Sequence, residues 1–299
     1  MKILLNRRPI RNQPYGGGVQ FINNFVDIAT QAGHQVIHEL EDNIDVIFIF
    51  NAHDDVNNVR AIDAVAYKMN NPKTKLAIRL NDCDKRKETN TVDVMYSVLS
   101  QYVDTSVFVS HWMKEYYLQN VNWNCLSNHV IVNGCNKSIF KPNKKLDNGK
   151  INIVCHHWSD NEMKNVGLNE FLDDFIATHQ DFTFTYIGRT KSVLKNSRVI
   201  QPLFGEALGN ELGKYDVYIS NSYADPGPNH VCESISCGLP TYANVKGGGG
   251  AEFAGRDHQF SDFHELALIL LRKDFRQNIT TFPTWDKCIH QYLELMKLL

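Results

Sequence analysis

The chain has 299 residues, of which 43% are hydrophobic and 21% charged, and its formal net charge at pH 7 is -2. That length allows two hydrophobic cores of about 130 to 150 residues each, and the balanced charge argues against the broad basic surface typical of nucleic-acid-binding proteins. No apolar run reaches the ~18 residues of a membrane-spanning helix, and MKILLNRR is too short for a signal peptide. We therefore expect a soluble protein, or one in peripheral contact with a membrane.

Apolar, strand-like runs alternate with helix-length segments along the first half of the chain, which predicts a parallel sheet with helices on both faces. The predicted strands cover residues 2–6, 34–40, 45–51, 75–80, 105–110 and 129–133. The predicted helices cover residues 18–34, 56–70, 91–102 and 111–120. A polar, turn-rich stretch at 136–150 then indicates a linker, so the first domain is expected to cover residues 1–147.

The second half of the chain restarts the same alternation. Its predicted strands cover residues 151–157, 182–188, 197–201 and 216–221. Its predicted helices lie near 167–179, 205–213, 262–273 and 286–298. We therefore expect a second α/β domain over residues 148–285, followed by a helical segment at 286–299.

The cysteines are odd in number and lack the C-x-x-C spacing of a zinc site or a redox motif. They are Cys83, Cys125, Cys135, Cys155, Cys232, Cys237 and Cys288. Several lie in apolar runs, which favours reduced thiols in the core. A cytoplasmic protein is the expectation that follows.

The segment 218–252 combines two carboxylates with a turn between a strand and a helix. Asp225 and Glu233 are eight residues apart, and the pattern predicts a buried strand before them and a helix over 230–238 that Gly238 ends. The helix N-terminus then opens at the carboxyl end of a strand, where its free N–H groups favour an anion such as a diphosphate. Both carboxylates are expected to face the same ligand.

This segment resembles the nucleotide-sugar site of the retaining family 4 glycosyltransferases of the GT-B fold. Their signature is an acidic residue, seven others, a Glu in a run like E-x-x-x-x-G-x-P, a Gly-Gly turn and another Glu. The matching residues here are Asp225, Glu233, Gly238, Pro240, Gly247 to Gly250 and Glu252. The family usually has Glu at the first acidic position, where this chain has Asp225.

The resemblance implies an α/β protein of two Rossmann-like domains whose parallel sheets face a central cleft, with the C-terminal helix packing back on the N-terminal domain. It further implies transfer of a sugar from a nucleotide-diphosphate sugar, with UDP- or GDP-sugars expected, to a glycan, lipid or protein acceptor. Configuration at the sugar would be retained. Neither a metal nor another cofactor is expected, because GT-B enzymes generally neutralise the diphosphate with side chains and helix dipoles.

The same resemblance assigns the donor side. Asp225 would hold sugar hydroxyls, Glu233 would bind the ribose, and Lys164 would neutralise the diphosphate. An arginine that the family places shortly before this lysine is absent, and Ser159 and His157 stand near its position. Arg189 either supplies the second positive charge or is an ordinary surface arginine. The full set of expected donor-binding residues is Gly16, Gly17, Gly18, Ser159, Arg189, Pro228, Asn229, His230, Val231 and Glu233.

Acceptor-side candidates come from the first domain, where strands end toward the expected cleft. Arg79 and Asn81 stand at the end of one predicted strand, His53 follows another, and His111 opens a helix. The family often has a first-domain histidine near the reacting carbon, and either His53 or His111 fits that description. The D-x-D tripeptide at 82–84 suggests a metal site, but a solvated loop explains its charges and we expect no metal there.

Two other functions fit the same residues. A degenerate GT-B module would bind a nucleotide sugar or a glycan without transferring it, as the absent arginine suggests. A GT-B enzyme with different chemistry, such as a sugar-nucleotide epimerase, would release free nucleotide without needing an acceptor.

Overall fold

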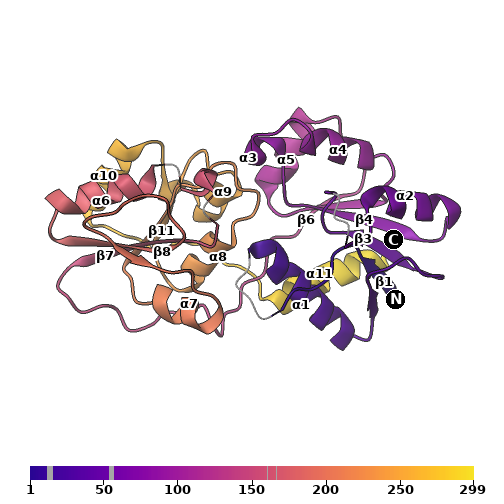
Figure 1. Ribbon diagram of the computed structural model, residues 1–299, viewed down its shortest axis with the longest axis horizontal. Coiled ribbons are helices and arrows are strands. Elements are labelled where there is room, and N and C mark those ends of the chain that lie inside the picture. Colours follow the sequence, from indigo (N-terminus) through magenta and orange to yellow (C-terminus); the bar gives the residue numbers. More distant parts are fainter. Residues whose placement is uncertain (12–15, 54–56, 160, 166) are drawn as a thin grey trace. The chain divides into compact units, whose positions relative to one another are not determined.

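The computed structural model describes residues 1–11, 16–53, 57–159, 161–165 and 167–299. The chain divides into two compact units. Unit 1 holds the described residues of 1–13, 17–134 and 283–299, and unit 2 holds Gly16 and the described residues of 135–282 (Figure 1). The division falls after Gly134 rather than at residue 147, because the segment that follows packs on unit 2.

Unit 1 is built on a parallel sheet with six strands within the described residues. In spatial order they are β2 (Gln35–Ile37), β1 (Lys2–Leu5), β3 (Val46–Ile49), β4 (Lys75–Leu80), β5 (Thr105–Phe108) and β6 (Asn128–Val130). The helices of this unit are α1 (Gly17–Gln31), α2 (Ala61–Asn70), α3 (Asp84–Lys87), α4 (Val92–Leu99), α5 (His111–Asn120) and α11 (Trp285–Lys297).

The strands of unit 1 are apolar on both faces because helices cover both sides of the sheet. Ile3 and Leu5 of β1 pack with α1 and α11, while Leu4 between them packs with residues of α2, α4 and α5. Successive side chains of a strand point to opposite faces, so a continuous apolar run is what a sheet covered twice requires. Figure 1 shows α11 beside α1 although the two are far apart in sequence.

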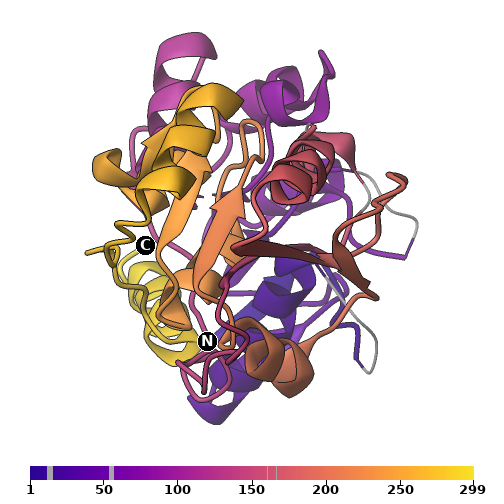
Figure 2. The same cartoon turned by 90° about the vertical axis from the view of Figure 1, so that its left-hand side faces the viewer.

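Unit 2 repeats the architecture with a second parallel sheet, again of six strands within the described residues. In spatial order they are β12 (Gln259–Phe260), β11 (Thr241–Asn244), β10 (Val217–Ser220), β7 (Ile151–His157), β8 (Phe182–Gly188) and β9 (Arg198–Ile200). Its helices are η1 (Glu162–Lys164), α6 (Leu168–Thr178), α7 (Gly205–Leu212), α8 (Asn229–Ser236), α9 (Gly249–Ala254), η2 (Arg256–His258) and α10 (Phe263–Arg272). Figure 2 turns this unit toward the viewer, with α6 and α10 on one side of the sheet and α7 on the other.

The segment expected to be a linker is part of unit 2. Asn143 donates a side-chain hydrogen bond to the carbonyl of Asn210, and a Cβ added to Gly209 of α7 would lie 2.4 Å from the carbonyl oxygen of Ile139. The segment therefore lies directly on α7, and glycine at 209 is what permits the approach. The polar composition of the segment did not reveal this packing, because the contacts include backbone atoms, which composition does not describe.

The D-x-D stretch is also not a solvated loop. Residues 84–87 form α3, and both Asp82 and Arg86 are 6% exposed. Asp84 accepts hydrogen bonds from the Thr89 hydroxyl and from backbone N–H groups at the start of α4, including that of Val92. These bonds hold its pKa below the usual range against the effect of burial. Its carboxylate therefore fixes a helix terminus.

All seven cysteines lie within the described residues, and each is buried and outside any disulfide. This confirms the expectation of core thiols. Within the described ranges, no helix combines the length and the apolar character needed to cross a membrane.

Candidate functional site

The central feature of unit 2 is the turn over residues 221–228, which joins the carboxyl end of β10 to the N-terminus of α8. The N–H of Asp225 donates to the carbonyl of Gly247 at 3.1 Å, and the N–H of Gly249 donates to the carbonyl of Asp225 at 2.8 Å. A Cβ on Gly249 would lie 2.4 Å from the carbonyl oxygen of Pro226. The glycine-rich run 247–250 thus packs backbone against backbone on the turn, which explains why side chains are absent there.

Asp225 and Lys164 form an ion pair at this turn. Lys164 Nζ lies 2.5 Å from Asp225 Oδ2, and the two side chains are 25% and 7% exposed. The lysine comes from η1, which the turn holds in place: the Ser222 hydroxyl donates to the carbonyl of Lys164, and the N–H of Tyr223 donates to that of Met163. Two residues that are 61 positions apart in sequence are therefore brought together beside the start of α8.

Glu233 lies one turn into α8 and contacts a histidine that the sequence analysis did not single out. Its Oε2 is 2.9 Å from Nε2 of His156 in β7, and both side chains are almost fully buried. The two residues are 77 positions apart. The signal in the sequence was only a pair of histidines at the end of an apolar run, which does not indicate a partner.

Two further histidines lie at the same ends of β7 and α8. His230, in the first turn of α8, has Nε2 2.9 Å from the Ser220 hydroxyl, and its ring centroid is 4.6 Å from that of His157. Nδ1 of His157 has no hydrogen-bond partner among the described residues. Burial lowers the pKa of His157 well below its usual range, and the nearby His230 and Lys164 lower it further. His157 is therefore neutral near pH 7.

Arg189 and Ser159 line one polar pocket of about 340 Å³ at the carboxyl ends of β7 and β8. The Arg189 guanidinium lies 5.0 Å from the ring centroid of Trp158 and donates to the Trp158 carbonyl at 3.4 Å. Arg189 therefore rests on an aromatic face at the pocket wall.

The remaining donor-side predictions are divided between the units. Pro228 caps α8, and Asn229 and Val231 belong to its first turn with His230. Gly16 belongs to unit 2, whereas Gly17 and Gly18 are the first residues of α1 in unit 1.

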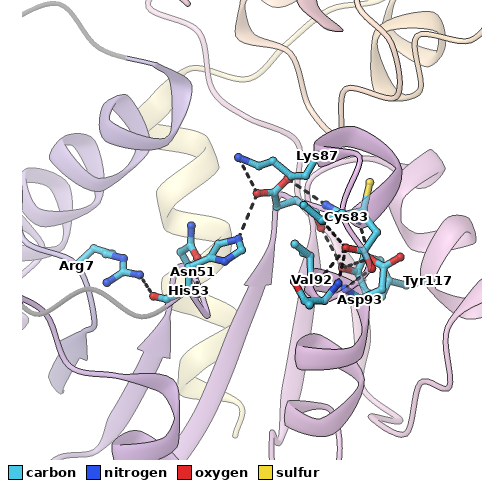
Figure 3. Close-up of polar contacts among 12 residues, drawn as sticks. Arg7, Asn51, His53, Cys83, Lys87, Val92, Asp93 and Tyr117 are labelled. Atoms are coloured by element: carbon cyan, nitrogen blue, oxygen red, sulfur yellow. Dashed lines mark hydrogen bonds and ion pairs between the residues drawn. The ribbon is translucent and has the colours of Figure 1, made fainter. Parts of the chain in front are cut away.

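In unit 1, His53 and Asp82 follow the neighbouring strands β3 and β4. His53 Nε2 lies 3.5 Å from Asp82 Oδ2, and Lys87 Nζ lies 3.2 Å from the same oxygen (Figure 3). The other carboxylate oxygen accepts from the N–H of Cys83. His111 is the exposed first residue of α5, and Asn81 is half-buried after β4.

Arg79, predicted on the acceptor side, is instead an interior residue of unit 1. It is 1% exposed, donates to the Asn133 side chain at 2.8 Å, and lies 4.3 Å and 5.0 Å from the ring centroids of Phe21 and Phe50. Two aromatic faces and an amide oxygen stabilise the buried charge. Because the Arg79 side chain is enclosed, it is not exposed for direct contact with a sugar acceptor.

Comparison with known proteins bears on the fold. No protein-family model matches the chain, and no curated protein matches it. Among solved structures, sucrose-phosphate synthase from Thermosynechococcus elongatus is 13% identical over 99% of this chain and 98% of that one, with a TM-score of 0.71. A glycosyltransferase from Rickettsia africae is 15% identical over the same shares, with a TM-score of 0.70.

WaaG, described as a glycosyltransferase involved in lipopolysaccharide biosynthesis, is 10% identical over 98% of this chain and 95% of that one, with a TM-score of 0.60. Likeness over nearly the full length at such low identity concerns the fold. With its two parallel sheets and their strand orders, the chain has the α/β fold of the GT-B glycosyltransferases.

Proposed function

We propose that this protein is a glycosyltransferase that binds a nucleotide-sugar donor on unit 2, around the N-terminus of α8. The observation that carries the proposal is the grouping of Lys164, Asp225 and Glu233 beside that terminus. The backbone N–H groups and the positive end of the helix dipole favour a diphosphate there. The lysine adds a full positive charge.

The chemistry follows from where charge develops. Breaking the bond between the sugar and the diphosphate builds negative charge on phosphate, which Lys164 and the α8 amides would stabilise. Asp225 would accept hydrogen bonds from sugar hydroxyls, and Glu233 from the ribose. We propose retention of configuration, a UDP- or GDP-sugar as donor, and a glycan, lipid or protein as acceptor. The acceptor-side residues His53, Asn81 and His111 stay predictions.

The first experiment is a donor screen. UDP-, GDP- and ADP-sugars are incubated with the protein and a panel of acceptors, with and without EDTA, and released nucleotide and glycosylated product are measured. We expect one donor class to give product, with EDTA making little difference. Lys164→Ala should lower kcat/KM by about 100-fold, the range found when a charge-stabilising group is removed, whereas Lys195→Ala, at an exposed lysine of the same unit, should not.

A second function, binding without transfer, is favoured by one observation. His157 is neutral, so the position near the absent arginine lacks a positive charge. A protein that binds nucleotide but gives no product above background with any donor would support this module. Release of free nucleotide and an altered sugar without acceptor would indicate the epimerase chemistry instead.

A further inference from the structure

His156 and Glu233 form a buried polar pair in unit 2. The imidazole and the carboxylate meet at 2.9 Å, with side chains 7% and 6% exposed. Nδ1 of His156 has no hydrogen-bond partner among the described residues. An ionised carboxylate only accepts hydrogen bonds, so the proton of a neutral His156 is on Nε2 and is donated to Glu233.

The position of His156 is itself fixed. Its backbone N–H donates to the Tyr218 hydroxyl, and that hydroxyl donates to the His156 carbonyl, both at 3.1 Å. Its ring centroid lies 5.5 Å from that of Tyr218 and 6.2 Å from that of His230, with both rings edge-on. The imidazole is therefore held by β10 and α8, and its Nε2–H points at one carboxylate oxygen.

We infer that His156 is a positioning residue for the nucleotide. It orients the Glu233 carboxylate so that an oxygen of this carboxylate lies in a fixed place to accept hydrogen bonds from the ribose hydroxyls of the nucleotide sugar. The inference rests on the proposed function, because Glu233 is the ribose-binding group there. A carboxylate on a flexible side chain loses rotamer freedom when it binds a ligand. The hydrogen bond from His156 already restricts the Glu233 side chain, so less rotamer freedom is lost when the nucleotide binds. His156 acts through Glu233 without touching the ligand.

Substitution of His156 by asparagine or by glutamine distinguishes the roles of its two ring nitrogens, Nδ1 and Nε2. The amide nitrogen of His156→Gln reaches the place of Nε2, so the bond to Glu233 is kept. That of His156→Asn reaches only the place of Nδ1, so the bond is lost while polarity and approximate size are retained. His264→Asn, at an exposed histidine of α10, is the control for substitution elsewhere in the unit.

The test is calorimetric titration of each full-length variant with UDP, GDP and ADP, with Tm measured in parallel. For the nucleotide that the wild type binds, we expect His156→Gln and His264→Asn to stay within about threefold of the wild-type Kd. His156→Asn should bind at least about tenfold more weakly, as expected for loss of a hydrogen bond to a charged group. In a Glu233→Ala background, where no side-chain oxygen is left to accept the imidazole hydrogen bond, His156→Asn should change Kd by less than about twofold, because coupled residues are not additive.

Three results would overturn the positioning role while leaving the proposed function standing: wild-type affinity in His156→Asn, weak binding in His156→Gln, or fully additive losses in the double variant. If His156→Asn does not fold, His156→Gln still decides, since affinity as low as that of Glu233→Ala would overturn the role. A folded wild type that binds none of the three nucleotides would contradict the proposed function and the positioning role together.

Discussion

At the scale of single residues, Lys164 and His157 differ in their surroundings. Lys164 reaches Asp225 with a quarter of its side chain exposed, whereas His157 is enclosed beside His230 and is neutral. Lys164 thus gives the site a positive charge, whereas the neutral His157 gives none. A cation at the position of the absent arginine would have to come with the ligand or from another side chain.

The lowered pKa of His157 makes stability depend on pH. Because the folded state binds this proton less readily than the unfolded state, stability is full above about pH 6.5 and falls as pH drops below it, by up to ~1.4 kcal/mol per pH unit for one histidine. The pKa values of His34 and His38 are also lowered, so these two histidines change stability with pH in the same direction. In His157→Gln, we expect the fall in Tm between pH 7.5 and 5.5 to be smaller than in the wild type.

The control for this prediction is His264→Gln on the surface of α10, which should show the wild-type fall. An equal fall in His157→Gln would mean that His157 is protonated in the folded protein.

At the scale of elements, the glycine run 247–250, whose last two residues begin α9, positions the acidic turn. Gly248 has a positive φ of 66°, which favours glycine, and Asp225 forms an isolated bridge with it. The sequence predicts no helix here, because four glycines oppose helix formation. Nor does the sequence predict a strand at 241–244 or 259–260, since such short segments carry too few residues to show a period. Tertiary packing on the turn outweighs the local preference.

Gly249→Ala tests this packing. Its Cβ would meet the Pro226 carbonyl at 2.4 Å, so the turn must shift, and we expect a loss of about 1 to 3 kcal/mol in the free energy of unfolding together with weaker nucleotide binding. Calorimetry and chemical denaturation measure the two effects.

The matched control is the neighbouring Gly250→Ala, whose Cβ would lie 3.4 Å from Pro228, an ordinary contact. It should be neutral or slightly stabilising, since alanine favours a helix by up to about 1 kcal/mol. Equal effects of the two substitutions would show that the close approach at 249 is unimportant.

At the scale of the whole molecule, the chain returns to unit 1 at its C-terminus. Trp285 and Tyr292 of α11 lie 6.2 Å and 5.1 Å, between ring centroids, from Phe21 of α1. A Cβ on Gly134 would lie 2.5 Å from the Trp285 backbone. The last helix therefore completes a core begun by the first, while Lys164, Asp225 and Glu233 all belong to unit 2.

This division predicts that stability and nucleotide binding can be separated. Trp285→Ala should lower the free energy of unfolding of unit 1 by about 3 to 5 kcal/mol, as large-to-small changes of buried aromatic residues do. The Tm of one calorimetric transition should fall accordingly. Nucleotide affinity below that transition should remain within about twofold, because Lys164, Asp225 and Glu233 lie in the other unit.

Leu298→Ala, at a position 84% exposed, is the control and should change neither quantity. Loss of nucleotide binding in folded Trp285→Ala would contradict a nucleotide site made by Lys164, Asp225 and Glu233 alone. Because the chain has two compact units, the transitions are to be analysed without a two-state assumption.

The sequence by itself determined the α/β class, most strands and helices, and the acidic turn with α8, because these depend on apolar periodicity and on residues close together in the chain. Only the tertiary structure decided that Lys164 pairs with Asp225, that His156 meets Glu233, that Arg79 is enclosed by aromatic rings, and that residues 135–147 pack on unit 2. Those contacts join positions far apart in sequence, and chain folding rather than local preference sets which side chains meet.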